Sequence, residues 1–156
     1  MGFLSWLEQT AYSEWIVAGL VGWPLMLSMH TVGISLIVGT ALAANLRLLG
    51  FFKPIPITSL RTLMGIGWFG IGLNVFSGVS LFMAQATFYV TSPPFLVKIT
   101  FIVLGIANLH HTQKVLKAEA GNWDSSGVPR QGLILGAAAI TFWTLATLTG
   151  RLIAYL

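Results

Sequence analysis

Residues 23–39 read WPLMLSMHTVGISLIVG, and the interpretation of the whole chain begins from this stretch. It lies in an apolar run long enough to cross a lipid bilayer, which requires about 20 residues of α-helix. An ionisable side chain inside such a run is costly to bury, so its presence predicts a functional site. His30 is the ionisable residue of this stretch, and we take it as the first candidate functional residue.

The composition is typical of a membrane protein. Of the 156 residues, 56% are apolar and only 8% are charged, whereas soluble domains carry about 25% charged residues. The net charge of +4 does not indicate a nucleic-acid partner, because the basic residues lie mostly between the apolar runs, like the loop charges of membrane proteins. The chain has no cysteine, which excludes disulfides, iron–sulfur ligation and covalent c-type haem attachment.

The apolar runs predict an all-α fold, namely an integral membrane four-helix bundle in which residues 1–156 form a single domain. A short amphipathic helix lying in the membrane interface is expected before the first span. The predicted segments are the interfacial helix at 3–14 and spans at about 15–46, 60–85, 94–112 and 131–154. The first span is longer than a bilayer requires, and Pro24 predicts a kink within it.

The basic residues predict how the spans are oriented. Most of them belong to the first and third loops or their flanks: Arg47, Lys53, Arg61, Lys114, Lys117 and Arg130. The positive-inside rule places these loops in the cytoplasm and both termini outside. We therefore expect a multi-pass protein of a bacterial inner membrane.

Two histidines on different spans are predicted to meet inside the bundle. At 3.6 residues per turn, His30 lies on a stripe of mostly small residues. His111, on the third span, is predicted to face the bundle interior, whereas His110 shares its face with branched apolar residues and is predicted to face lipid or another subunit. His30 and His111 match in depth only if the first span enters the bilayer at Trp15 rather than at Trp23.

A pair of imidazoles from two helices of a bundle is suited to ligating the iron of one haem b. The sequence therefore predicts His30 and His111 as the metal ligands, with His110 as the alternative to His111. Three histidines suffice for one haem per chain, whereas two haems would need four histidines or another ligand such as methionine.

The surroundings that a porphyrin needs are also predicted. Small side chains at Gly33, Gly67 and Gly70 are expected to leave flat space between helices. Arg47 and Arg61 are expected to bind the propionates, because a guanidinium matches the geometry of a carboxylate.

Other interpretations of the same residues stay open. The histidines can be hydrogen-bonding groups between the helices of a non-redox structural or assembly subunit, and the glycines can serve helix packing. Met26, Met29 and His30 are consistent with a copper carrier, since thioethers suit Cu(I), and a haem carrier is a related possibility. No set of nucleophile, base and acid is present, so the sequence supports no enzymatic chemistry beyond electron transfer.

The stretch Met29-His30-Thr31-Val32-Gly33, with His111 or His110 on the third span, resembles small bacterial four-span b-type cytochromes. It is similar to the haem-binding anchor subunits of respiratory complexes and to an uncharacterised family of four-span bacterial proteins with Met-His-Thr-x-Gly in the first span. The resemblance implies haem b and electron transfer, by a stand-alone cytochrome or by a subunit of a larger redox complex. The expected partners are the lipid bilayer, further copies of the chain or other membrane redox subunits, and a quinone.

Overall fold

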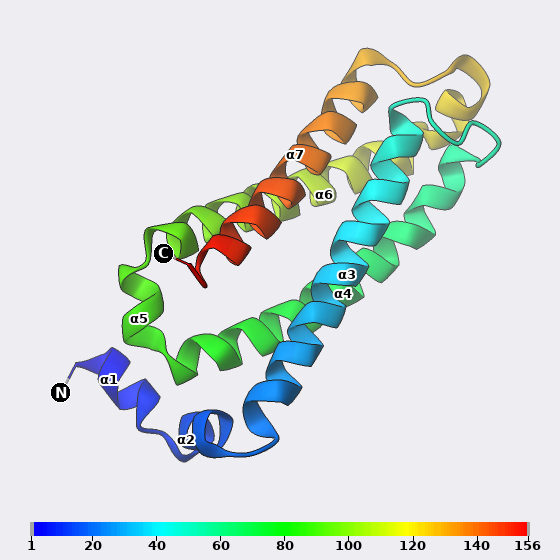
Figure 1. Ribbon diagram of the computed structural model, residues 1–156. Coiled ribbons are helices and arrows are strands. Elements are labelled where there is room, and N and C mark those ends of the chain that lie inside the picture. The colour runs from blue at the N-terminus through cyan, green and yellow to red at the C-terminus, as the bar shows by residue number, and fades with distance from the viewer. Residues whose placement is uncertain (1, 156) are drawn as a thin grey trace.

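The computed structural model describes residues 2–155, and within this range it is helical and has no strand (Figure 1). In chain order the helices are α1 (Phe3–Glu8), α2 (Ala11–Ala18), α3 (Gly22–Leu48), the short 3-10 helix η1 (Ile57–Ser59), α4 (Leu60–Ala84), α5 (Ala86–Thr91), α6 (Pro93–Ser126) and α7 (Arg130–Leu152). Helix α3, the η1–α4 segment, α6 and α7 are each long and apolar enough to cross a membrane. The predicted all-α membrane bundle is therefore confirmed.

The N-terminal segment differs from the single interfacial helix that the sequence predicts, because it forms α1 and α2. Thr10 separates them: its side-chain oxygen accepts a hydrogen bond from the backbone N–H of Ser13 at 3.3 Å and so caps α2. The carboxylate of Glu8 accepts hydrogen bonds from the backbone N–H and the hydroxyl of Thr87, at 2.8 and 2.7 Å. This contact ties α1 to α5.

The first span also begins later than predicted. Helix α2 ends at Ala18 and α3 begins at Gly22, so the apolar run that contains Trp15 and Trp23 is two helices rather than one. Pro24 lies in the first turn of α3. A proline there removes an N–H that would have no partner within the helix, so Pro24 is accommodated at the start of α3 and does not kink it.

The third span is longer than predicted. Helix α6 continues through the expected third loop to Ser126. Its polar second half stays helical because Leu116, Ala120 and Trp123 recur every three or four residues and are all buried. The connection to α7 is correspondingly short.

The four long helices form two hairpins. Helices α3 and α4 make the most extensive helix–helix contact, and α6 and α7 make the next. Glycines let the first pair approach closely: a Cβ on Gly33 would lie 3.0 Å from the backbone nitrogen of Asn74, and one on Gly70 would lie 2.9 Å from the Cβ of Leu36. The second pair is similar, because Gly105 of α6 lies directly against the ring of Trp143 of α7.

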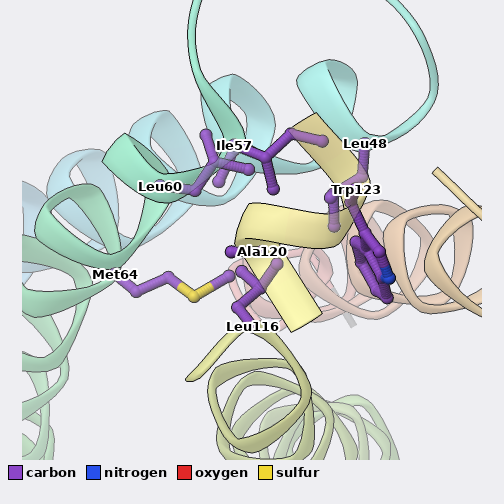
Figure 2. Packing of buried hydrophobic residues seen from close by; sticks show 8 residues of the cluster. Leu48, Ile57, Leu60, Met64, Leu116, Ala120 and Trp123 are labelled. Carbon is purple, nitrogen blue, oxygen red and sulfur yellow. The ribbon is translucent and has the colours of Figure 1, made fainter. Parts of the chain in front are cut away.

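The hairpins are joined at the end that carries the loops after α3 and α6, which we call the closed end. A cluster of buried residues from α3, η1, α4 and α6 forms its core (Figure 2). The members are Ala44, Leu48, Ile57, Leu60, Met64, Leu116, Ala120 and Trp123. Asp124 strengthens the joint, since its carboxylate accepts hydrogen bonds from the backbone N–H groups of Ile57 at 2.6 Å and Thr58 at 3.2 Å.

The other end, which contains α1, α2 and α5, is arranged differently, and we call it the open end. Figure 1 shows α6 and α7 diverging from α3 and α4 in this direction. The core cluster there consists of Ile16, Met26, Leu81 and Ala84, from α2, α3 and α4 alone. The second hairpin therefore contributes no buried residue to the core of the open end within the described part of the chain.

Candidate functional site

His30 lies on α3 in the open half of the molecule and is half-buried against α4. Its Nδ1 lies 3.1 Å from the hydroxyl oxygen of Ser77, which is fully buried. The Ser77 hydroxyl donates its own hydrogen to the carbonyl oxygen of Leu73 at 2.8 Å, so it is left to accept the hydrogen bond from Nδ1–H. This arrangement puts the proton of a neutral imidazole on Nδ1 and leaves the lone pair of Nε2 free to bind a ligand.

A second hydrogen bond holds the backbone at this position. The side-chain amide of Asn74 donates to the carbonyl oxygen of His30 at 3.0 Å. Asn74 and Ser77 are three residues apart and therefore share one face of α4. Neither Asn74 nor Ser77 was identified from the sequence as a partner of His30. The signal available in the sequence was that two polar residues, Asn74 and Ser77, lie three positions apart within an apolar helix, which indicates a polar contact on one face of that helix.

Lys98 belongs to the same region, although it comes from the second hairpin. It lies near enough to His30 for its charge to act on the imidazole. The end of its side chain packs on Gly150 of α7, where an added Cβ would lie 3.2 to 3.5 Å from Cδ, Cε and Nζ. The four acidic residues of the chain lie at the two ends of the bundle: Glu8, Glu14, Glu119 and Asp124. The charge of Lys98 thus reaches His30 from the second hairpin, and no acidic residue lies in the apolar part of the spans, an environment that favours an anionic or electron-rich ligand.

The prediction that His111 faces the bundle interior is wrong. His110 and His111 are both exposed on α6, whereas Gly105 and Thr112 are buried. Successive residues of an α-helix are rotated by about 100°, so the packing of Thr112 turns His111 away from the core. Periodicity did not reveal this, because polar residues lie on both sides of α6 at this depth: Thr112 is buried, whereas His110 and His111 are exposed.

His30 and His111 also differ in depth. The central core cluster brings Leu109 of α6 together with Ile37 and Ala41 of α3, so His111 lies near the level of Ala41. His30 is eleven residues from Ala41 towards the open end, or about 16 Å along the helix. The structure therefore does not bring the two predicted iron ligands together, and the reason is that the first span begins at Gly22.

The predicted cradle for a porphyrin is occupied by helix contacts. Gly33 and Gly70 face each other across the α3–α4 interface, and a Cβ on Gly67 would lie 3.0 Å from the hydroxyl oxygen of Thr40. These glycines serve helix packing, which was the alternative interpretation of the sequence.

The two predicted propionate ligands lie elsewhere as well. Arg61 is sixteen residues from Ser77, about 24 Å along α4, and is therefore far from His30. Arg47 donates from Nε to the carbonyl oxygen of Ile55 in the loop of the closed end. Of the basic residues, it is Lys98 whose charge acts on His30.

The methionines of the suggested copper site have packing roles. Met26 is buried in the core of the open end, and Met29 packs against the same cluster. Among residues 2–155, no three His, Asp or Glu side chains are grouped so that they could hold a metal ion. Comparison of the chain with protein-family models, with curated proteins and with solved structures finds no match.

Proposed function

We propose that the protein is an electron-transfer subunit of a membrane redox complex and binds haem b through His30. The observation that carries this proposal is the hydrogen bond between Nδ1 of His30 and Ser77, which leaves Nε2 as the free nitrogen. Histidine ligands of metals are oriented in the same way, with the second ring nitrogen bonded to a neighbouring group. Haem b would supply one-electron transfer.

The surroundings of His30 support a shared site rather than a stand-alone cytochrome. The diverging hairpins leave the open end without a core between them, and Lys98 provides a cation for a propionate. One chain contributes one histidine here, so a second protein ligand to the iron would come from another copy or another subunit, and a small molecule could take its place. A quinone is a further candidate occupant, since its carbonyl oxygens accept hydrogen bonds from a lysine.

The proposed location is a bacterial inner membrane with both termini outside. It rests on the basic residues, most of which belong to the closed end, the end that the positive-inside rule assigns to the cytoplasm.

An absorption spectrum of the purified full-length protein, expressed with added haem precursor, tests the proposal. We expect a b-type band in the reduced-minus-oxidised spectrum of the wild type and its loss in His30→Ala. His110→Ala and His111→Ala are matched controls and should keep the band, because both side chains are exposed on α6. A colourless wild-type protein of normal stability would contradict haem binding, and loss of the band in His111→Ala would contradict the assignment to His30.

A second candidate function is a non-redox assembly subunit. The hydrogen bonds from His30 to Ser77 and from Asn74 to the His30 carbonyl favour it, since both join α3 to α4. In this case the wild type binds no haem, and His30→Ala lowers the stability of the α3–α4 hairpin instead. A denaturation series measured on the same samples separates the two functions.

A further inference from the structure

A groove at the closed end is independent of the site at His30. Its volume is about 470 Å³, and it lies between the start of α4 and the polar half of α6. The residues that line it are Thr58, Arg61, Thr62, Gln113 and Lys117. All are polar or charged, and the two charged members are both cations.

The orientation of Gln113 is fixed by a hydrogen bond. The indole nitrogen of Trp68 donates to Oε1 of Gln113 at 2.9 Å. The amide nitrogen of Gln113 is left as a donor beside Arg61 and Lys117, so the groove presents a guanidinium, an ammonium and an amide NH₂ group. The nearest carboxylate that the contacts identify is Asp124, which is bonded to the backbone N–H groups of Ile57 and Thr58 and does not line the groove. Such a set of donors is complementary to a phosphate group.

The position of the groove indicates what carries the phosphate. Arg61 stands where the apolar part of α4 begins, and a basic residue at the end of an apolar span is expected at the boundary between the membrane and water. From there Gly65, Phe69 and Gly72 continue along α4 at spacings of three or four, and all three are exposed. A Cβ on Gly65 or Gly72 would meet no atom within 4 Å, so open surface adjoins the protruding ring of Phe69.

We propose that this groove binds the headgroup of an anionic phospholipid, with an acyl chain lying along the exposed Gly65–Phe69–Gly72 stripe of α4. The cations bind the phosphodiester, and the apolar stripe binds the chain. Basic pockets between membrane helices at a membrane surface bind anionic lipids in this way. The inference goes beyond the proposed function, since it involves neither His30 nor haem.

The test compares lipids by native mass spectrometry of the full-length protein released from detergent. We expect phosphatidylglycerol to bind about tenfold more tightly than phosphatidylcholine. Both lipids carry the phosphodiester, but the quaternary ammonium of phosphatidylcholine cancels its charge and is repelled by Arg61 and Lys117. The double variant Arg61→Gln/Lys117→Gln should lose this preference. Lys53→Gln/Arg130→Gln removes the same charge from exposed residues of the closed end outside the groove, and it should keep the preference.

Two further measurements identify the source of the phosphate and guard against misfolding. Inorganic phosphate and a short-chain phosphatidylglycerol should bind weakly, because neither occupies the stripe on α4. If the double variant does not fold, the single variant Thr62→Val replaces it in the test. Thr62 lines the groove and is exposed, so this variant should fold and should bind phosphatidylglycerol several-fold more weakly than the wild type. Equal loss in both double variants, equal binding of the two headgroups, or full affinity for inorganic phosphate would each overturn the proposal.

Discussion

The closed and open ends of the bundle are built from the same four long helices but are stabilised differently. At the closed end, both hairpins contribute to one apolar core, and Asp124 adds hydrogen bonds to the backbone of η1. At the open end, the buried core comes from the first hairpin and α2, and among the described residues the second hairpin adds only the partly buried ring of Phe95, which stacks on Phe82 with ring centroids 5.8 Å apart. The candidate site therefore lies where the chain does not complete its own packing.

This difference shows how a small membrane protein can combine a stable scaffold with a binding site. Lipid is as apolar as leucine, so helices associate in a membrane through close packing and hydrogen bonds rather than through hydrophobic burial. The closed end extends beyond the apolar spans through the polar half of α6, and there burial of apolar side chains can also contribute. Rigidity at one end leaves the other free to receive a further component.

The largest expected effect is at the closed-end core. Trp123→Ala should lower the free energy of unfolding by about 3–5 kcal/mol, because the indole is buried and its removal leaves a cavity. Phe88→Ala, which removes a half-exposed ring at the open end, should have little effect. Denaturation in mixed micelles, followed by circular dichroism, measures both variants. Similar losses of unfolding free energy in the two variants would mean that the closed end is not stabilised more strongly than the open end by its buried core.

A second effect is expected within the first hairpin. Gly70→Ala should cost about 1–3 kcal/mol, because the new Cβ would lie 2.9 Å from the Cβ of Leu36 and force α3 and α4 apart. Gly72→Ala is the matched control on the same helix. A Cβ there meets no atom within 4 Å, and alanine favours the helix, so this variant should be neutral or stabilising. The same denaturation series measures the difference, and equal effects would contradict close packing at Gly70.

A smaller effect is expected at the candidate site. Ser77→Ala removes the acceptor of the His30 Nδ1–H hydrogen bond and should cost about 1 kcal/mol, the size of a polar contact between membrane helices. Ser35→Ala is the control, because that hydroxyl bonds to the carbonyl of Thr31 within its own helix. If haem binds at His30, Ser77→Ala should also change its midpoint potential, which redox titration measures. If neither the midpoint potential nor the stability changed in Ser77→Ala, the hydrogen bond to Ser77 would not orient the imidazole of His30.

The smallest effect concerns the contact between α1 and α5. The hydrogen bonds from Thr87 lower the pKa of the exposed Glu8 carboxyl below its ordinary value of 4.5. A carboxyl with a lowered pKa stabilises the folded contact above its ordinary pKa, and this contribution is lost as the pH falls through the lowered value. Trp6 fluorescence should therefore change below about pH 4.5 in the wild type but not in Glu8→Gln. Glu14→Gln should behave as the wild type, and a pH response that persists in Glu8→Gln would assign it to another group.

The choice of His30 as a candidate functional residue depended on local sequence alone. The structure shows that its imidazole and its backbone carbonyl are hydrogen-bonded to α4, and its role as a haem ligand stays a prediction. Its proposed partner His111 was placed on the wrong face of α6. Hydrophobic periodicity identifies a buried face only when that face is apolar and the opposite face is polar. Here a polar residue, Thr112, is buried while His110 and His111 are exposed, so the pattern could not distinguish His111 from Thr112. Lys98 was not among the predicted site residues, since its sequence neighbours do not show which helices flank it.

The sequence by itself determined that the protein is helical, that four segments can span a membrane, and that His30 is the unusual residue of the first of them. Length and hydropathy are local properties, and they suffice for these conclusions. The tertiary structure decided that α3 begins at Gly22, where a side chain would collide with the backbone carbonyl of Trp15 in α2. It also decided that His111 is exposed and that the hairpins share buried residues at the closed end and in the middle but not at the open end, because these features depend on which helix faces pack together.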